Sequence, residues 1–145
     1  MKKLYIIIGV VASFVLTSCH FATSDNGDLD GLWQGMYKED IATGTVTDMR
    51  DYNATWAFQG GMVQMNTIGI PASHVIGAFT KTDNCLKIER LSYFTHGKGD
   101  TPIEDFAVLS VFGISQNSET FRIVELNDDA LRVESSQVRL SFRKY

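Results

Sequence analysis

Short segments of alternating apolar and polar residues constrain the fold of this 145-residue chain more than any other feature. Residues 137–143 alternate strictly, and Trp56 and Phe58 share one face of an earlier segment. Gly60-Gly61 follows that segment, and two glycines suit the two-residue turn of a β-hairpin because both tolerate a positive φ. A side-chain period of two residues is that of a half-buried β-strand. The pattern therefore predicts antiparallel strands joined by short turns.

About eight such strands are expected between Gly31 and Tyr145. The segments with this pattern are 31–37, 52–59, 62–67, 75–80, 86–94, 106–112, 121–126, 131–134 and 137–143. Many short strands at regular spacing are typical of a β-sandwich or an antiparallel barrel. In a barrel, closure removes the edge strands that otherwise invite aggregation. The sequence thus predicts one all-β domain over residues 31–145.

One segment carries two conflicting signals. Thr101-Pro102-Ile103-Glu104 has the pattern of a helix N-terminus, with a hydroxyl at the N-cap, proline next and glutamate at the third helical position. The residues from Phe106 to Phe112 are β-branched or aromatic for the most part and are apolar on both faces. We expect a strand over 106–112, and the pattern leaves open whether residues 102–112 begin as a helical turn.

The N-terminus has the form of an export signal. Lys2 and Lys3 precede an uncharged, largely apolar run of 13 residues from Leu4 to Leu16. Such a run fits a signal peptide and is shorter than the roughly 20 residues that span a bilayer as a helix. The run ends in Leu16-Thr17-Ser18-Cys19, which resembles the lipobox of bacterial lipoproteins.

This resemblance implies cleavage before Cys19 and attachment of lipid to its sulfur, which would anchor the protein in a membrane. Residues 1–18 are then the signal peptide, 19–30 the lipidated cysteine with a flexible acidic tether, and 31–145 the folded domain. We expect an outer-membrane protein of the cell envelope. His20 does not match the aspartate of an inner-membrane retention signal, and the periplasmic and surface faces both stay open.

The net charge limits the possible binding partners, and the cysteine content limits the possible disulfide bonds. The formal net charge is −4 for the whole chain and −6 once Lys2 and Lys3 are removed. An acidic domain without a basic stripe is not expected to bind nucleic acid. With Cys19 used by the anchor, Cys85 is the remaining cysteine and the mature chain can form no intramolecular disulfide.

A second resemblance concerns the domain itself. Gly31-Leu32-Trp33, at the first expected strand, is similar to the G-x-W motif of lipocalins and lipocalin-like barrels. The resemblance implies an antiparallel, up-and-down β-barrel of about eight strands in which Trp33 closes one end. It also implies that an arginine of the last strand, Arg139 or Arg143, stacks on Trp33. The chain lacks the paired cysteines of secreted lipocalins and is shorter than they are.

No pattern of catalytic or metal-binding residues is present. The three histidines, His20, His74 and His96, have none of the spacings of a preformed zinc site. Paired acids fall at expected turns, where they are solvated. We therefore expect a non-enzymatic protein without metal or cofactor.

The aromatic residues leave two functions open. The candidates for the lining of an apolar cavity are Trp33, Trp56, Phe58, Phe79, Phe106 and Phe121. Cavities lined in this way hold small ligands, so one hypothesis is a binding module for a small apolar or amphipathic molecule. The alternative is that the aromatic side chains fill the core, and that the barrel is a scaffold for protein interaction or inhibition through its loops, the Thr95–Asp100 loop among them.

Overall fold

The computed structural model describes residues 26–70 and 73–145, so the predicted signal peptide and Cys19 lie outside the described residues. The strands are β1 (Gly31–Asp40), β2 (Val46–Asp48), β3 (Thr55–Gln59), β4 (Met62–Asn66), β5 (His74–Lys81), β6 (Cys85–Thr95), β7 (Gly99–Pro102), β8 (Ser118–Leu126), β9 (Ala130–Glu134) and β10 (Val138–Lys144). The described residues also form three short 3-10 helices, η2 (Gly27–Leu29), η3 (Met49–Tyr52) and η4 (Phe106–Phe112). No helix in the described part of the chain is long and apolar enough to cross a membrane.

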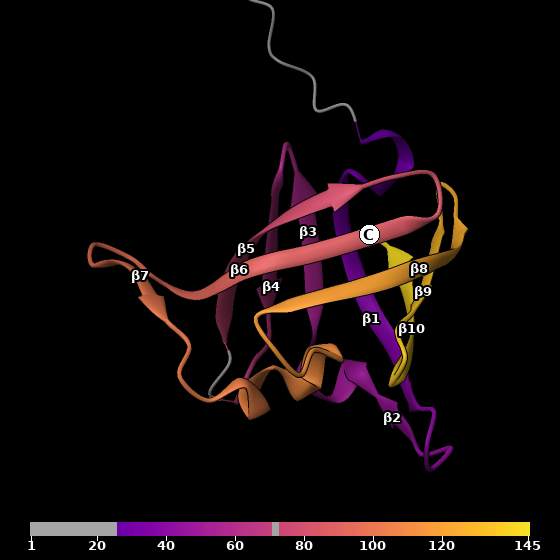
Figure 1. Cartoon of the computed structure of the whole chain (residues 1–145), viewed down its shortest axis with the longest axis horizontal. Helices are drawn as coiled ribbons and strands as arrows, with labels where there is room; N and C mark the ends of the chain where they lie inside the picture. The colour runs from indigo at the N-terminus through magenta and orange to yellow at the C-terminus, as the bar shows by residue number, and fades with distance from the viewer. Residues whose placement is uncertain (1–25, 71–72) are drawn as a thin grey trace, which may run out of the picture.

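Eight of the described strands form a closed antiparallel barrel (Figure 1). Each pairs with the next in the order β1, β3, β4, β5, β6, β8, β9 and β10. The barrel closes because β10 pairs with β1, from Trp33 opposite Lys144 to Asp40 opposite Val138. The predicted all-β, up-and-down barrel of about eight strands is therefore confirmed. The remaining strands, β2 and β7, extend from β1 and β6.

Strand β1 changes partner along its length. Its first half pairs with β3 and its second half with β2. Between Gly35 and Tyr37 the register against β10 shifts by one residue, which is a β-bulge at Met36. Gly35 is needed here because a Cβ at this position would lie 2.9 Å from the terminal methyl of Met49. The bulge thus bends β1 where η3 packs against it.

The core lies inside the barrel and follows the alternation of the strands. Trp56 and Phe58 of β3 are buried, as predicted, and the inward residues of β10 are Val138, Leu140 and Phe142. Gly60 has φ +60°, and Gln59 pairs with Met62 across the predicted two-residue turn. For β3 and β10, period-two alternation therefore predicted both the strand and its buried face.

Residues 106–112 form η4 and not the predicted strand. Asp105 caps this 3-10 helix by accepting a hydrogen bond from the Ala107 N–H at 2.9 Å, and Gly113 ends it with φ +75°. Leu109 and Phe112 face the core from the end of the barrel. The helix-start pattern at Thr101 left open a helical turn in residues 102–112; residues 99–102 pair with β6 as strand β7, and the helical residues begin at Phe106.

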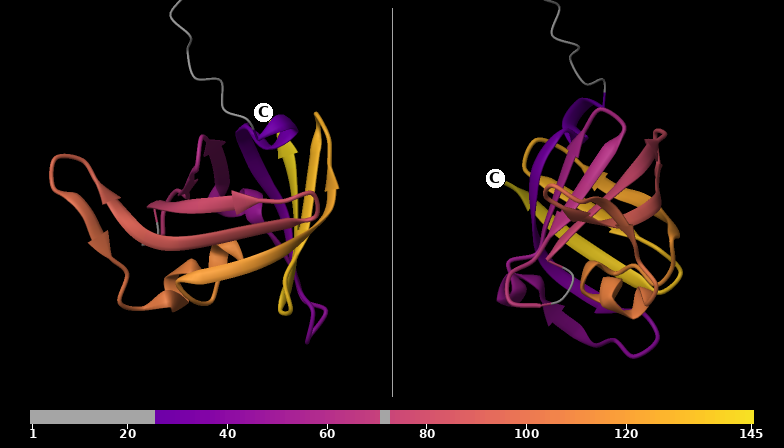
Figure 2. Two further views of the ribbon diagram at one scale, coloured as in Figure 1. Left: turned by 45° about the horizontal axis from the view of Figure 1, so that its top comes forward. Right: turned by 90° about the vertical axis from the view of Figure 1, so that its left-hand side faces the viewer.

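The folded domain begins before Gly31. Leu29 of η2 is fully buried, and the Asn26 side chain donates to the Gly60 carbonyl at 2.8 Å. The prediction of a flexible tether up to Asp30 is therefore wrong for residues 26–30. Figures 1 and 2 show η2 at one end of the barrel, with η3 and η4 at the opposite end.

The last residues of β6 (92–95) and strand β7 form an arm that projects from the barrel wall (Figure 2). Residues 95–102 of this arm are all exposed. Gly97 and Gly99 have φ values of +78° and +75°, which allow the tight turn between the two strands. The arm contains the Thr95–Asp100 loop of the alternative hypothesis.

Candidate ligand-binding site

Most of the predicted cavity-lining aromatic residues contact one another in the centre of the barrel. Trp56 lies 6.0 Å from Phe58, 5.8 Å from Phe121 and 4.7 Å from Phe142, measured between ring centroids. Phe58 in turn meets Phe79 at 5.0 Å. Because β3 and β8 are not neighbours in the sheet, Trp56 reaches across the interior. These side chains pack into a core, and their role toward a ligand stays a prediction.

Trp56 has one feature that packing does not explain. Its indole N–H is buried and is without a hydrogen-bond partner among the described residues. The comparable N–H of Trp33 donates to the Leu29 carbonyl at 2.8 Å. A buried donor without an acceptor costs about 1–3 kcal/mol. An acceptor atom of a bound molecule, or an ordered water, would remove that cost.

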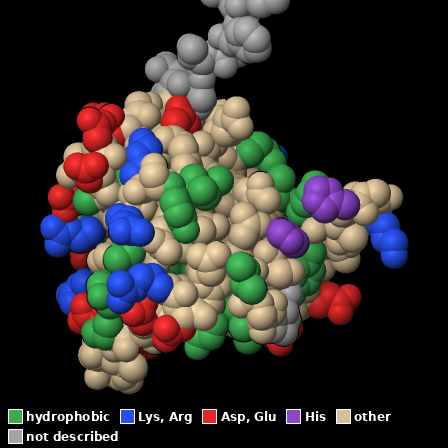
Figure 3. Space-filling view, turned by 180° about the vertical axis from the view of Figure 1, so that it is seen from behind, with side chains coloured by type: hydrophobic (Ala, Val, Ile, Leu, Met, Phe, Trp, Pro, Cys, Tyr) green, Lys and Arg blue, Asp and Glu red, His purple; other side chains and the backbone are tan. Residues whose placement is uncertain are grey.

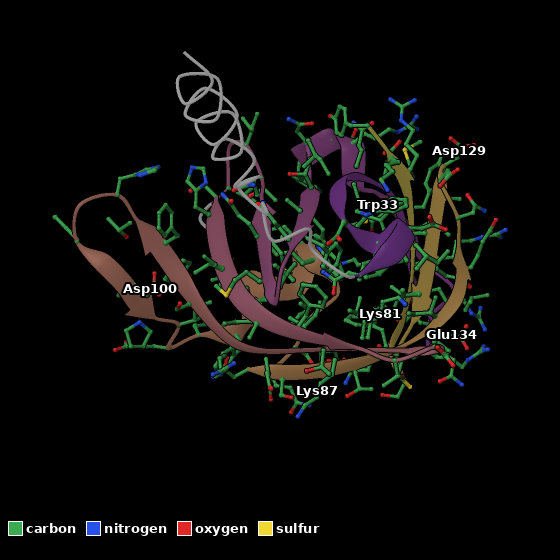
Figure 4. The ribbon with its side chains drawn as sticks, turned by 90° about the horizontal axis from the view of Figure 1, so that it is seen from above. Trp33, Lys81, Lys87, Asp100, Asp129 and Glu134 are labelled. Atoms are coloured by element: carbon green, nitrogen blue, oxygen red, sulfur yellow. The ribbon has the colours of Figure 1, made fainter. Side chains whose placement is uncertain are left out.

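Trp33 lies beside η2 at one end of the barrel (Figure 4), and the cation over its ring is Lys144. The Lys144 ammonium lies 5.0 Å from the ring centroid and donates to the Asp28 carbonyl at 2.7 Å. The prediction of Arg139 or Arg143 at this position is wrong. Even-numbered residues of β10 point inward, so both arginines lie on the outer face.

At the other end, η4 leaves a hollow between itself, η3 and β2. Its volume is about 370 Å³. The apolar residues that line it are Met49, Ile70, Ala107, Val108 and Val111. The other lining residues are Lys38, Thr47, Tyr52 and Ser110. Phe106, the sixth predicted aromatic residue, belongs to η4 and packs half-buried against the core. The predicted aromatic set therefore does not line this hollow.

Lys38 is the one charged residue among the described residues that line this hollow. It pairs with Leu140, whose side chain is buried, so Lys38 points to the inside of the barrel. Its ammonium donates to the Ser110 carbonyl of η4 at 2.5 Å. Burial lowers the pKa of Lys38, and the nearby charge of Asp40 acts in the opposite direction. Sequence reasoning missed this residue because strict alternation from Trp33 places Lys38 outside, and the bulge at Met36 reverses the faces.

A second hollow, of about 480 Å³, lies on the outer face of β1, β8, β9 and β10. Arginine and glutamate side chains are interleaved on this side of the molecule (Figure 3). Arg139 lies 3.1 Å from Glu39 and 3.5 Å from Glu134, which also pairs with Arg122. Exposed ion pairs of this kind contribute little to stability, because water screens them. The charges of this surface already neutralise one another.

The described residues do not gather into a metal site. Among residues 26–70 and 73–145, no group of three or more His, Cys, Asp and Glu side chains could hold a metal ion. His74 shares a hydrogen bond of 2.8 Å with Asn66, and the His96 ring meets Phe94 at 4.8 Å. Cys85 is a free, half-buried thiol at the first residue of β6. A hydrogen bond, a ring contact or partial burial therefore accounts for the position of each of these three side chains.

Comparison with known proteins agrees with this architecture. A family model described as a lipocalin-like domain matches residues 14–145. The chain belongs to the lipocalin-like domain family. No curated protein matches this lipocalin-like chain.

Two solved structures share the lipocalin-like fold. A lipocalin-like protein from Bacteroides uniformis is 22% identical, with a TM-score of 0.61 over 82% of this chain and 100% of that one. An uncharacterized protein from Bacteroides eggerthii is 21% identical, with a TM-score of 0.59 over 81% of this chain and 99% of that one. At this identity the likeness extends to the fold alone.

Proposed function

We propose that this lipocalin-like protein is a non-enzymatic binding module that holds a small apolar or amphipathic molecule in the hollow beside η4. The observation that carries the proposal is the hollow itself, about 370 Å³ at the mouth of a β-barrel. Small-molecule sites are often found in barrel mouths, with volumes of roughly 300–1,000 Å³ and mainly apolar walls. Five apolar and four polar side chains line this one.

The outer hollow is a weaker candidate, although it is larger. Its walls include Arg132, Arg139, Glu39 and Glu134, all of which take part in ion pairs. A ligand there would have to displace these pairs or bind beside them. Apolar ligands gain most from contact with apolar walls, which favours the hollow beside η4.

Polar groups accompany the apolar walls of the hollow. Ligand sites combine apolar walls with a few polar groups that fix orientation. Lys38, Thr47 and Tyr52 are such groups, and all three line the hollow beside η4.

Anchoring to the membrane is part of the proposed function. The apolar run before Cys19 and its lipobox-like end support a lipid on that sulfur. A lipid anchor would keep the module in the cell envelope, on the periplasmic or surface face of the outer membrane. The described residues begin at the η2 end of the barrel, and the hollow lies beside η4 at the opposite end.

The experiment is to fill the hollow. Ala107 is exposed on η4 and lines it, so Ala107→Trp should block the space without disturbing the core. Ala42→Trp, in the exposed turn after β1, is the matched control. Binding is followed with a neutral, environment-sensitive probe, N-phenyl-1-naphthylamine. We expect the probe to bind the parent and Ala42→Trp but not Ala107→Trp; equal binding by all three, or by none, would contradict the proposal.

A second candidate function, protein interaction, is favoured by the β6–β7 arm. Strand β7 pairs with β6 and with no other described strand, so its second edge is open to an extended peptide of a partner. The test is photocrosslinking in cells from a reactive residue at His96, with Thr80 on the barrel wall as control. Adducts from position 96 alone would support a partner at the arm, and their absence would argue against it.

A further inference from the structure

Lys38 carries a positive charge in a hollow that is lined by no other charged residue of the described chain. The acid whose charge acts on it is Asp40, the last residue of β1, whose Oδ1 already accepts hydrogen bonds from the backbone N–H groups of Ala42 and Thr43. None of the ion pairs among the described residues includes Lys38. The ammonium is therefore half-buried without a carboxylate in direct contact.

The ammonium also has unused hydrogen-bonding capacity. A lysine ammonium carries three N–H donors, and one of them reaches the Ser110 carbonyl. Removing a charge from water is costly unless an opposite charge or further hydrogen bonds replace the water. The lowered pKa of Lys38 reflects this loss of hydration. An anionic group in the hollow would supply both the opposite charge and the acceptors.

From this geometry, and resting on the proposed function, we infer that the ligand is an anionic amphipath whose carboxylate or phosphate head pairs with Lys38. Its apolar chain would lie against Met49, Val108 and Val111. The hydroxyls of Thr47 and Tyr52 also line the hollow and can donate to the oxygens of such a head group. An uncharged molecule of the same length would fill the hollow but leave the ammonium unpaired.

The test compares ligands that differ in the head group alone. Dodecanoate, dodecyl phosphate and dodecanol are titrated into the purified protein by calorimetry below their aggregation concentrations. We expect at least one of the two anions to bind about tenfold or more tightly than dodecanol, because hydrogen bonds to charged groups are stronger than neutral ones. Which anion binds more tightly distinguishes a carboxylate from a phosphate ligand.

Substitution of Lys38 then tests whether its charge causes the preference for the anion over dodecanol. Lys38→Gln should lower the affinity for the anion to that for dodecanol, whereas Lys98→Gln, on the exposed arm, should change neither. Lys38→Met, which keeps the length of the side chain, is a second neutral variant if Lys38→Gln does not fold. Retained binding of dodecanol shows that the hollow is intact in the variant used.

The possible outcomes distinguish a failure of this inference from a failure of the proposed function. If the parent binds dodecanol as tightly as both anions, or if a neutral Lys38 variant keeps the preference, the charge of Lys38 does not select the ligand. The hollow would then remain a site for an uncharged molecule. If none of the three ligands binds the parent, both the inference and the proposed function are wrong.

Discussion

Inward and outward orientation along β1 and β10 decides which side chains reach the two ends of the barrel. On β10, Phe142 and Lys144 point inward, which brings Lys144 over Trp33. This position could have been predicted, because Lys144 follows Phe142 at the period of the strand. The inward position of Lys38 could not, because it depends on the bulge at Met36, for which the sequence has no clear signal.

At the residue scale, the two tryptophans should respond differently to replacement by phenylalanine. Trp33→Phe removes the hydrogen bond to Leu29 and weakens the contact with Lys144. Trp56→Phe removes an N–H that has no partner among the described residues. Both side chains are fully buried, so the loss of volume is similar.

We expect Trp33→Phe to lower the free energy of unfolding by about 1 kcal/mol or more beyond the loss caused by Trp56→Phe. Urea denaturation of the ligand-free variants measures both. An equal or larger loss in Trp56→Phe would mean that its N–H has a favourable interaction that the structure does not record.

At the element scale, strands of five or more residues were predictable and the shorter elements were not. Strands β2 and β7 have three and four residues, too few for alternation to be recognised. In η4, β-branched and aromatic residues indicated a strand, but Asp105 and Gly113 provide the two caps of a 3-10 helix. Packing of Leu109 and Phe112 on the barrel end outweighs the local preference.

The C-terminal cap of η4 should be sensitive to a single methyl group. Gly113 has φ +75°, and a Cβ there would lie 2.8 Å from a methyl of Leu140. Gly44 has φ +70° with open space around it, so Gly44→Ala measures the backbone effect alone. We expect Gly113→Ala to lower the free energy of unfolding by about 2–4 kcal/mol and Gly44→Ala by about 1 kcal/mol. Equal losses in thermal or urea unfolding would contradict a tight contact between η4 and β10.

The stability that the N-terminal cap of η3 contributes should fall at acidic pH. Hydrogen bonds from Arg50 lower the pKa of Asp48 from 3.8 to about 2, and its carboxylate caps η3 through the Arg50 backbone N–H. A pKa lowered by folding contributes stability above the unfolded value, and this contribution is lost as the pH falls through the folded value. Between about pH 4 and pH 2, the parent should therefore lose more stability than Asp48→Asn, as measured by urea midpoints. Parallel curves for the two proteins would count against this cap.

At the scale of the whole molecule, the two ends of the barrel differ. Trp33, η2 and Lys144 pack together at the end where the described residues begin, and η3 and η4 frame the hollow at the other. The closed barrel was predictable because alternation and turn residues recur along the chain. The hollow was not, because it combines residues from β1, β2, η3, the β4–β5 loop and η4, which are distant in sequence.

The proposed anchor leads to a prediction about where the protein is found. Cells that produce the parent should incorporate an alkyne-labelled fatty acid into it and hold it in the membrane fraction. Cys19→Ser should lose both the label and the membrane association, whereas Cys85→Ser should keep both. Retention of the label in Cys19→Ser would contradict lipidation at this residue.

Native mass spectrometry of the protein purified from its own cells tests the central claim, that the hollow beside η4 holds a ligand, most directly. The parent and Ala107→Trp are released from detergent under the same conditions and compared with their denatured masses. The account predicts a reproducible extra mass on the parent that leaves on denaturation and is missing from Ala107→Trp. A bare parent, or the same extra mass on both proteins, would contradict it.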